Sequence, residues 1–163
     1  NLTFAPRGIL QIDDARIIYR NFAGAASKFN REGDRNFSIV IPDQEMADAL
    51  VNEGWNVKIK APREDGDVPF MTLPIKFKIN HRAPNTYLQT INRIDHLNQD
   101  SIACLDQIDI VSVDLDVRPY DWVLYEGTKD EKRGRSAYLQ SIKVVQDVDR
   151  FASRFAEEEY PEE

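Results

Sequence analysis

Short runs of alternating apolar and polar residues, separated by residues typical of turns, dominate the chain. In Ile75-Lys76-Phe77-Lys78-Ile79, the apolar side chains would point to one face of a strand and both lysines to the other. In residues 111–117 the same alternation would place four apolar side chains inward, with Asp114 and Asp116 outward. The pattern predicts eight strands, at residues 15–22, 35–41, 55–60, 73–80, 86–91, 110–118, 121–125 and 137–145.

One helix is well defined by its start and stop signals. Asp43 can cap the free amides of a first turn, and the apolar residues that follow are spaced as on one face of a helix. Glu53-Gly54 supplies the stop, because glycine suits a left-handed cap. A second short helix is predicted to start at Asp100. Residues 62–69 and 126–135 are predicted to be loops, and residues 118–121 a turn that links two paired strands.

Many short strands with one or two small helices indicate a mostly β fold, an elaborated OB-like barrel with a sandwich as the alternative. Helices do not alternate regularly with strands, which disfavours a parallel α/β fold. A length of 163 residues fits one domain. We expect a barrel domain at residues 1–145, followed by a helical turn and a disordered acidic C-terminal tail at residues 146–163.

The charge of the chain is unevenly distributed. The net charge is −7, of which −5 belongs to residues 146–163. Residues 68–94 contain no acid and carry +4, and residues 15–41 carry +3. Residues 101–126 hold six acids against Arg118 alone. The negative net charge therefore does not exclude a nucleic-acid ligand, because the predicted barrel has basic segments of its own.

The residues needed for catalysis are scarce. His81 and His96 are the only histidines, and no Walker loop, nucleophile elbow or zinc-ligand spacing occurs. The single cysteine, Cys104, lies in an apolar setting and is interpreted as a plain buried thiol. Asp13-Asp14 and the pair Asp114 and Asp116 could in principle hold Mg²⁺, which leaves a metal-dependent nuclease as a third hypothesis. The sequence predicts no enzyme, no metal and no cofactor.

Aromatic residues interleaved with basic ones form a more informative pattern. Proteins bind single strands through a basic groove for phosphates and aromatic faces on which bases stack. Phe29 is favoured for stacking, because it lies in a predicted loop between Ser27-Lys28 and Asn30-Arg31. Phe77 alternates with two isoleucines and is predicted to be core. The candidate binding residues are Tyr19, Phe29, Trp55 and Tyr87 for stacking, and Arg20, Lys28, Arg31, Arg35, Lys58, Lys60, Lys76, Lys78 and Arg82 for phosphates.

Four segments have a character that composition alone does not describe. They are Lys28-Phe-Asn-Arg-Glu-Gly-Asp-Arg-Asn-Phe37, Leu50-Val-Asn-Glu-Gly-Trp-Asn-Val-Lys58, the strand pair expected over residues 106–122, and the acidic residues 151–163. In these segments the chain resembles phage-encoded single-stranded-DNA-binding proteins. The resemblance implies an OB-type fold, non-catalytic binding of single strands and a role in phage DNA replication or recombination. The ending Tyr160-Pro-Glu-Glu163 departs from the cellular bacterial proteins, whose acidic stretch closes with phenylalanine.

We therefore expect a single-stranded-DNA-binding protein that acts by phosphate neutralisation and base stacking. Its expected partners are single-stranded DNA and, through the acidic tail, replication or recombination proteins. No apolar run approaches the roughly 20 residues that span a bilayer, so a cytoplasmic location in the host cell is expected. The alternative function is a protein-interaction module that engages a host complex through an acidic face at residues 101–126.

Overall fold

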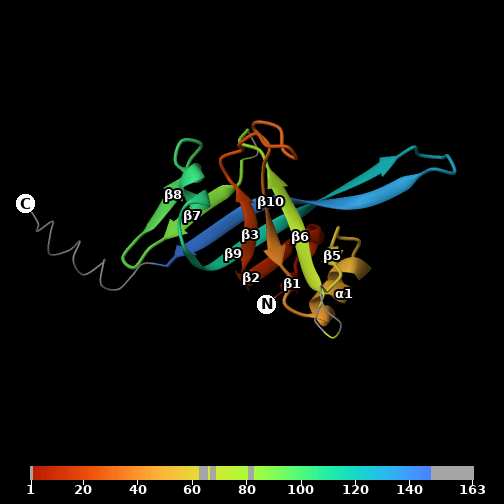
Figure 1. Ribbon diagram of the computed structural model, residues 1–163, viewed down its shortest axis with the longest axis horizontal. Coiled ribbons are helices and arrows are strands. Elements are labelled where there is room, and N and C mark those ends of the chain that lie inside the picture. Colours follow the sequence, from red (N-terminus) through yellow and green to blue (C-terminus); the bar gives the residue numbers. More distant parts are fainter. Residues whose placement is uncertain (1, 63–65, 67–68, 81–82, 148–163) are drawn as a thin grey trace, which may run out of the picture.

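The computed structural model describes residues 2–62, 66, 69–80 and 83–147 (Figure 1). Arg82 and almost all of the predicted tail therefore lie outside the described residues. The strands are β1 (Leu2–Phe4), β2 (Leu10–Ala15), β3 (Ile17–Asn21), β4 (Arg35–Val40), β5 (Lys58–Lys60), β6 (Phe70–Phe77), β7 (Asn85–Gln89), β8 (Ile94–Leu97), β9 (Ile110–Leu124) and β10 (Lys132–Gln146). The helix α1 spans Gln44–Asn52, and two short 3₁₀ helices cover Pro6–Gly8 (η1) and Ile102–Asp106 (η2).

The strands form one sheet that curls into an OB-like barrel. Its main path runs β1-β2-β9-β10-β6-β4-β3, and β3 continues β2 after the single residue Arg16. The path thus ends on the continuation of its own second strand, which brings the sheet round on itself (Figure 1). The β7–β8 hairpin adds to β10 in parallel, beside the β9 pairing. The prediction of a mostly β, OB-like fold is confirmed.

The core follows the period of two that the sequence shows. Ile75 and Phe77 of β6 are buried, as are Val113, Leu115 and Val117 of β9. Val111 is an exception, because it is exposed near the start of β9. Phe22, Phe37 and Phe77 pack together, with the rings of Phe22 and Phe37 stacked at 5.0 Å. Phe77 is therefore core, as predicted.

Helix α1 begins and ends where its signals indicate. The Asp43 carboxylate accepts a hydrogen bond of 2.7 Å from the Met46 amide, and Gly54 follows the helix with a φ of 91°. Ala47 and Leu50 are buried on its apolar face. The helix lies beside β5 (Figure 1). Within the described residues, no helix is long and apolar enough to cross a bilayer.

β9 and β10 form a long hairpin that projects from the barrel (Figure 1). The predicted turn at residues 118–121 is wrong, because β9 runs unbroken through Pro119 to Leu124. β2 pairs with β9 only up to Val117, and a strand edge that lacks a partner tolerates proline. The predicted loop at 126–135 is likewise too long, since β10 begins at Lys132. We call residues 118–138 the arm.

The sequence pattern did not predict three of the strands, or predicted them only in part. β1 has three residues, β2 was predicted only from its last residue onward, and β8 has four residues. Arg16 separates β2 from β3, so the single strand predicted at 15–22 corresponds to the last residue of β2 and the whole of β3. The helix predicted from Asp100 is the 3₁₀ helix η2.

Candidate nucleic-acid interface

The sheet register brings four polar or aromatic residues into one row on the outer face of the barrel. Asn36 of β4 pairs with Lys76 of β6, which pairs with Tyr138 of β10, which pairs with Arg118 of β9. Paired residues point to the same face of a sheet. The flanking residues Ile75 and Phe77 point the other way, into the core. The row is therefore fixed by the strands and does not depend on a loop.

Tyr138 lies at the centre of this row, between two cations. The Lys76 ammonium lies 5.5 Å from the centre of the Tyr138 ring, and the Arg118 guanidinium lies 5.4 Å from it. The Tyr120 ring meets Tyr138 edge-on at 5.8 Å and is itself 57 % exposed. Cations within about 6 Å of an aromatic ring are attracted to its face. The arrangement places two positive charges and two aromatic rings within one short stretch of surface.

Two adjoining hollows on this face form a groove. One has a volume of about 450 Å³ and the other about 290 Å³, and both are lined by Phe77, Lys78 and Tyr138. We call their union the groove. Its charged lining residues are Arg31, Asp34, Arg35, Lys76, Lys78 and Arg118, five bases against one acid. Asp34 also pairs with Arg31 at 3.5 Å, so the field of the groove is positive.

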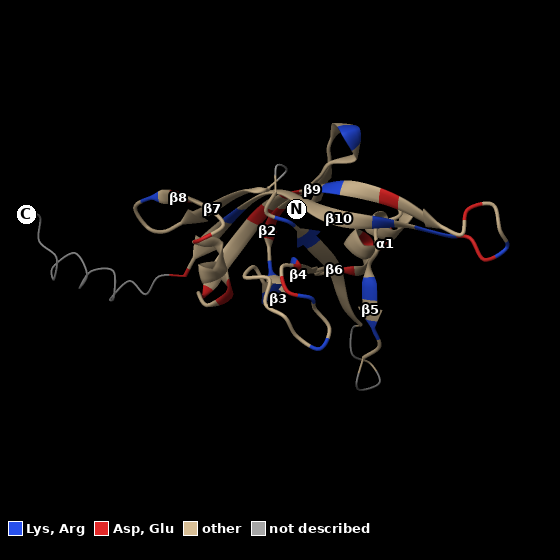
Figure 2. Cartoon of the chain, turned by 90° about the horizontal axis from the view of Figure 1, so that it is seen from above, with Lys and Arg blue, Asp and Glu red and all other residues tan. Residues whose placement is uncertain are grey.

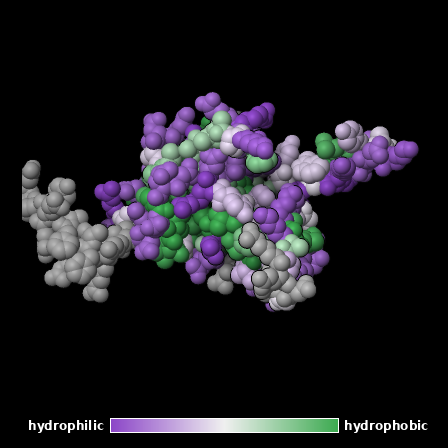
Figure 3. Space-filling view, viewed as in Figure 1, coloured by the Kyte–Doolittle hydropathy of each residue, from purple (hydrophilic) through white to green (hydrophobic). Residues whose placement is uncertain are grey.

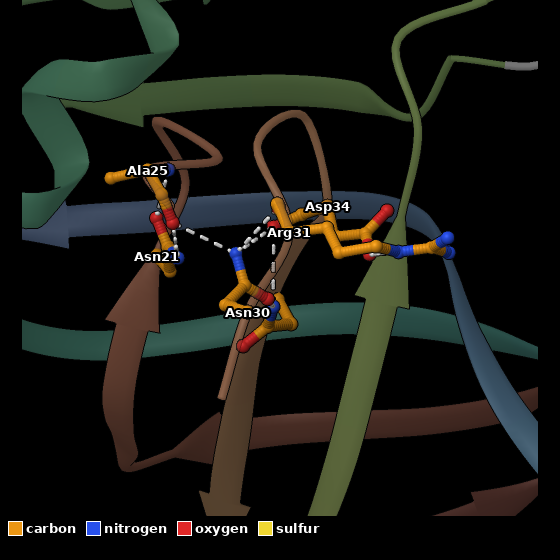
Figure 4. Close-up of polar contacts among 6 residues, drawn as sticks. Asn21, Ala25, Asn30, Arg31 and Asp34 are labelled. Atoms are coloured by element: carbon orange, nitrogen blue, oxygen red, sulfur yellow. Dashed lines mark hydrogen bonds and ion pairs between the residues drawn. The ribbon is translucent and has the colours of Figure 1, made fainter. Parts of the chain in front are cut away.

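The loop between β3 and β4 lines one end of the groove, and Figure 4 shows the polar contacts within this loop. The Asn30 side-chain amide donates hydrogen bonds of 2.9 Å to the carbonyls of Ala25 and Asp34, and its oxygen accepts one from Asn36. The Asn21 side chain likewise donates a hydrogen bond to the Ala25 carbonyl and accepts one from the Ala25 amide. These bonds fix the loop.

Phe29 is held at the tip of this loop. Its ring is 91 % exposed and also lines the groove, with the Lys28 ammonium 5.6 Å from its centre. The ring buries almost no surface in the fold, so its face is open to a ligand. The structure thus places Phe29 and Lys28 as a base-stacking and phosphate pair would require.

We expect Phe29→Ala to weaken binding of single strands by about 1–3 kcal/mol, since one stacking platform is removed. The free energy of unfolding should hardly change, because the ring buries almost no surface. Fluorescence anisotropy with a labelled oligonucleotide measures the first quantity and urea unfolding the second. A variant that unfolds at lower urea but binds normally would contradict this role for Phe29.

Other predicted phosphate contacts lie on the same outer face. Lys58 pairs with Thr72 and Lys60 with Phe70, so both lysines are in line with Lys76 along β6. They are exposed, and they extend the basic surface beyond the groove (Figure 2). Lys78 follows the end of β6 and lines both hollows.

Two predicted binding residues have structural roles instead. Trp55 is only 4 % exposed, with the Arg135 guanidinium over its ring at 5.4 Å, so it offers no face to a base. Arg20 donates hydrogen bonds of 2.8 and 2.7 Å to the carbonyls of Leu105 and Ile108, and thereby attaches η2 to β3. Its guanidinium is committed to the fold, and we withdraw both residues from the predicted site.

Three further predicted residues lie apart or play a double role. Arg35 lines the groove and also donates a hydrogen bond to the Phe22 carbonyl. Tyr87 stacks on His96 at 5.0 Å and borders a separate hollow among Asp13, Asp114 and Asp116. Such surroundings repel phosphate. Tyr19 is exposed in a left-handed backbone conformation at φ 55° and does not line the groove.

The sequence analysis missed Arg118, Tyr120 and Tyr138. Arg118 and Tyr120 were assigned to a turn, so their alternation with buried Val117 was not followed. The available signal was the continued period of two from Asp114 to Leu124, which places all even-numbered residues of β9 on one face. Tyr138 has the same alternation with buried Ala137 and Leu139.

The acids of residues 101–126 do not form one surface. Asp106 accepts hydrogen bonds from the amides of Phe22 and Ala23, and Asp114 pairs with Lys143. Asp121 points to the opposite face of β9, where hydrogen bonds from Arg135 lower the pKa of its carboxyl. In the part of the chain that the structure describes, no group of three or more acids, histidines or cysteines is placed to hold a metal ion.

Cys104 lies within η2 and is partly buried. Burial raises the pKa of its thiol, with a smaller contribution from the Asp106 carboxylate. A protonated thiol is a poor nucleophile, which agrees with an inert structural residue.

Comparisons with known proteins agree with the geometry. The family described as "Putative phage ssDNA-binding domain" matches residues 3–163. The single-stranded DNA-binding protein from bacteriophage Enc34 in complex with ssDNA superposes with a TM-score of 0.55 at 13 % identity, over 93 % of each chain. A C-terminal truncation of that protein gives a TM-score of 0.53 at 15 % identity, over 91 % of this chain and 92 % of the other. At such identities the likeness establishes the fold. No curated protein sequence matches the chain.

Proposed function

The chain belongs to the family of phage ssDNA-binding domains, and we propose that it binds single-stranded DNA in the groove across β4, β6, β10 and β9. The observation that carries this proposal is the register row of Asn36, Lys76, Tyr138 and Arg118, in which a tyrosine ring stands between two cations. The Enc34 protein, which has the same fold, has been captured with ssDNA. The role of the chain is in phage DNA replication or recombination, inside the host cell.

In this proposal the groove binds the strand by two kinds of contact. Tyr138 and Tyr120 in the floor, and Phe29 at the wall, offer rings to successive bases. The lysines and arginines around them neutralise phosphates, from Arg31 and Lys28 at the loop to Lys58 and Lys60 on β5. Duplex DNA has its bases stacked inward and cannot use these rings, so single strands are preferred.

The protein acts without catalysis in this proposal, and the acidic residues 146–163 form a separate tail. The tail carries a net charge of −5 and is proposed to visit the same basic groove when DNA is absent, or to engage replication proteins. Added salt would weaken the competition between tail and DNA, because the contacts of the tail are exposed to solvent.

We expect binding to single strands to be insensitive to EDTA and to leave the oligonucleotide intact. With about four to six phosphate contacts, log K should fall against log salt with a slope of roughly −3 to −4, near −0.7 per contact. Titrations at four salt concentrations measure this slope. The double variant Lys76→Ala/Lys78→Ala should reduce its magnitude by about 1.4.

The control for this experiment is Arg93→Ala/Arg133→Ala, which removes the same charge from two arginines outside the groove that pair with Asp95 and Glu131. With the control variant, a short oligonucleotide confined to the groove should give the same slope of log K against log salt as with the wild type. A flat salt response of the wild type would overturn the groove proposal, and cleavage that requires Mg²⁺ would replace it with a nuclease.

A further inference from the structure

The face of the sheet that holds the groove continues along the arm. On β9 the residues Tyr120, Trp122 and Leu124 follow Arg118 on the same side. Their partners on β10 are Ser136, Gly134 and Lys132. None of these six residues is acidic. Figure 3 shows the arm as a projection from the body, paler near its base than at its hydrophilic tip.

The other side of the arm has a different charge. It carries Asp121, which forms an ion pair of 2.7 Å with Arg135, and Arg133, which pairs with Glu131 at 3.2 Å. Its cations are therefore already matched by carboxylates. A polyanion following the arm would meet unpaired positive charge on the groove side alone, from Arg118 to Lys132.

Trp122 is seated on this side by a glycine. A Cβ on Gly134 would come within 2.3 Å of Cζ2 and 2.6 Å of Cε2 of the Trp122 indole, closer than carbon atoms can approach. The indole therefore occupies the space above Gly134 that any other residue would fill. Trp122 remains half-buried, so part of its ring stays open to solvent. Gly134 is the register partner of Trp122, and an aromatic side chain commonly covers a glycine on the neighbouring strand of a sheet in this way.

We propose that Trp122, seated on Gly134, is an additional stacking platform for the same DNA strand, which leaves the barrel groove past Tyr120 and follows the arm towards Lys132. This inference rests on the proposed function, because the strand must first occupy the groove. Tyr138, Tyr120 and Trp122 then form a series of rings along one continuous face. A base stacked on an aromatic side chain gains affinity without sequence preference, so the arm lengthens the site and leaves its specificity unchanged.

The chain offers a direct test, because Trp55 and Trp122 are its only tryptophans and Trp55 is buried. Stacking of a base on an indole quenches its fluorescence. We expect oligothymidylate to quench a larger fraction of the emission of full-length Trp55→Phe than of the wild type, and to leave Trp122→Phe unquenched. Equal quenching of wild type and Trp122→Phe would overturn the proposal.

A matched control moves the indole by one residue to the other side of the arm. The double variant Trp122→Phe/Val123→Trp also contains two tryptophans, but the new one points away from the groove face. We expect its new indole to stay unquenched by DNA. Quenching equal to that of the wild type would mean that DNA meets the arm without regard to its faces, which contradicts the proposal.

Affinity provides a second readout that depends on DNA length. Single OB domains bind about 4–16 nucleotides. Trp122→Ala should weaken binding of oligothymidylates near the upper end of that range by about tenfold, and leave those near the lower end unaffected. The same loss at all lengths, or no loss at any, would overturn the proposal. A change in Trp122 emission with protein concentration in the absence of DNA would assign the ring to contact with a second copy instead.

Failure of this inference is distinguishable from failure of the proposed function. If DNA binds with the expected salt slope but Trp122 is not quenched, the groove stands and the arm does not contribute. If no single strand binds at all, both fail together.

Discussion

Replacing Tyr138 by alanine should weaken binding of single-stranded DNA by about 2 kcal/mol, roughly 30-fold. The ring is the central element of the groove, and it is also what Lys76 and Arg118 lie against at 5.5 and 5.4 Å. Its removal therefore takes away a stacking platform and frees two cations to move into solvent. Fluorescence anisotropy at fixed salt measures the loss.

Two control variants make this prediction specific. Tyr138→Phe keeps the ring and should bind within about twofold of the wild type, because stacking requires the aromatic face and not the hydroxyl. Tyr87→Ala removes a tyrosine from the same outer surface, but from the hollow bordered by Asp114 and Asp116. That variant should bind normally. If Tyr87→Ala loses more affinity than Tyr138→Ala, the strand follows the other half of the sheet and the groove is wrongly assigned.

The sequence predicted those parts of the proposed site in which a suitable residue type occurs in an informative local pattern, such as a polar loop or an alternating strand. Phe29 stood out because a large apolar ring in a polar loop has no core to join, and it is 91 % exposed. Lys76 and Lys78 stood out because they alternate with buried residues of one strand. Both inferences need only the periodicity of a strand or the polarity of a loop.

The parts that were missed depend on pairings between distant segments. Trp55 follows a helix stop and begins a predicted strand, but a bridge between residues 55 and 135 brings Arg135 over its ring. Arg20 resembles a free surface cation, yet its partners are carbonyls 85 and 88 residues away. No local pattern shows such contacts, because they arise only when η2 packs beside β3.

Tyr138 is a groove residue that local sequence patterns likewise do not reveal. Its sequence neighbours alternate as in any half-buried strand, so nothing local distinguishes it from Tyr87. Its place at the centre of the groove follows from the register of β10 against β6 and β9, which sets Lys76 and Arg118 on either side. The proline at 119 obscured this register, because proline ordinarily marks a turn and here lies on a strand edge that has lost its β2 partner.

The Phe77 ring supports the groove from beneath, so its loss should act on stability. Phe77 is 2 % exposed and packs against Phe22 and Phe37 at 5.6 and 6.5 Å. Phe77→Ala should lower the free energy of unfolding by about 3–5 kcal/mol, because it leaves a cavity among rings that cannot close over it.

Urea unfolding followed by circular dichroism measures this loss, with Phe29→Ala as the matched control for removal of a phenylalanine ring. A loss of this size is a large part of the stability of an ordinary domain, so Phe77→Leu is the second variant, with a smaller loss that keeps the protein folded. Binding by folded Phe77→Leu should stay close to that of the wild type, since Lys76 is held by the backbone of β6 and not by the ring. Equal stabilities of Phe77→Ala and Phe29→Ala would contradict the assignment of one ring to the core and the other to the DNA.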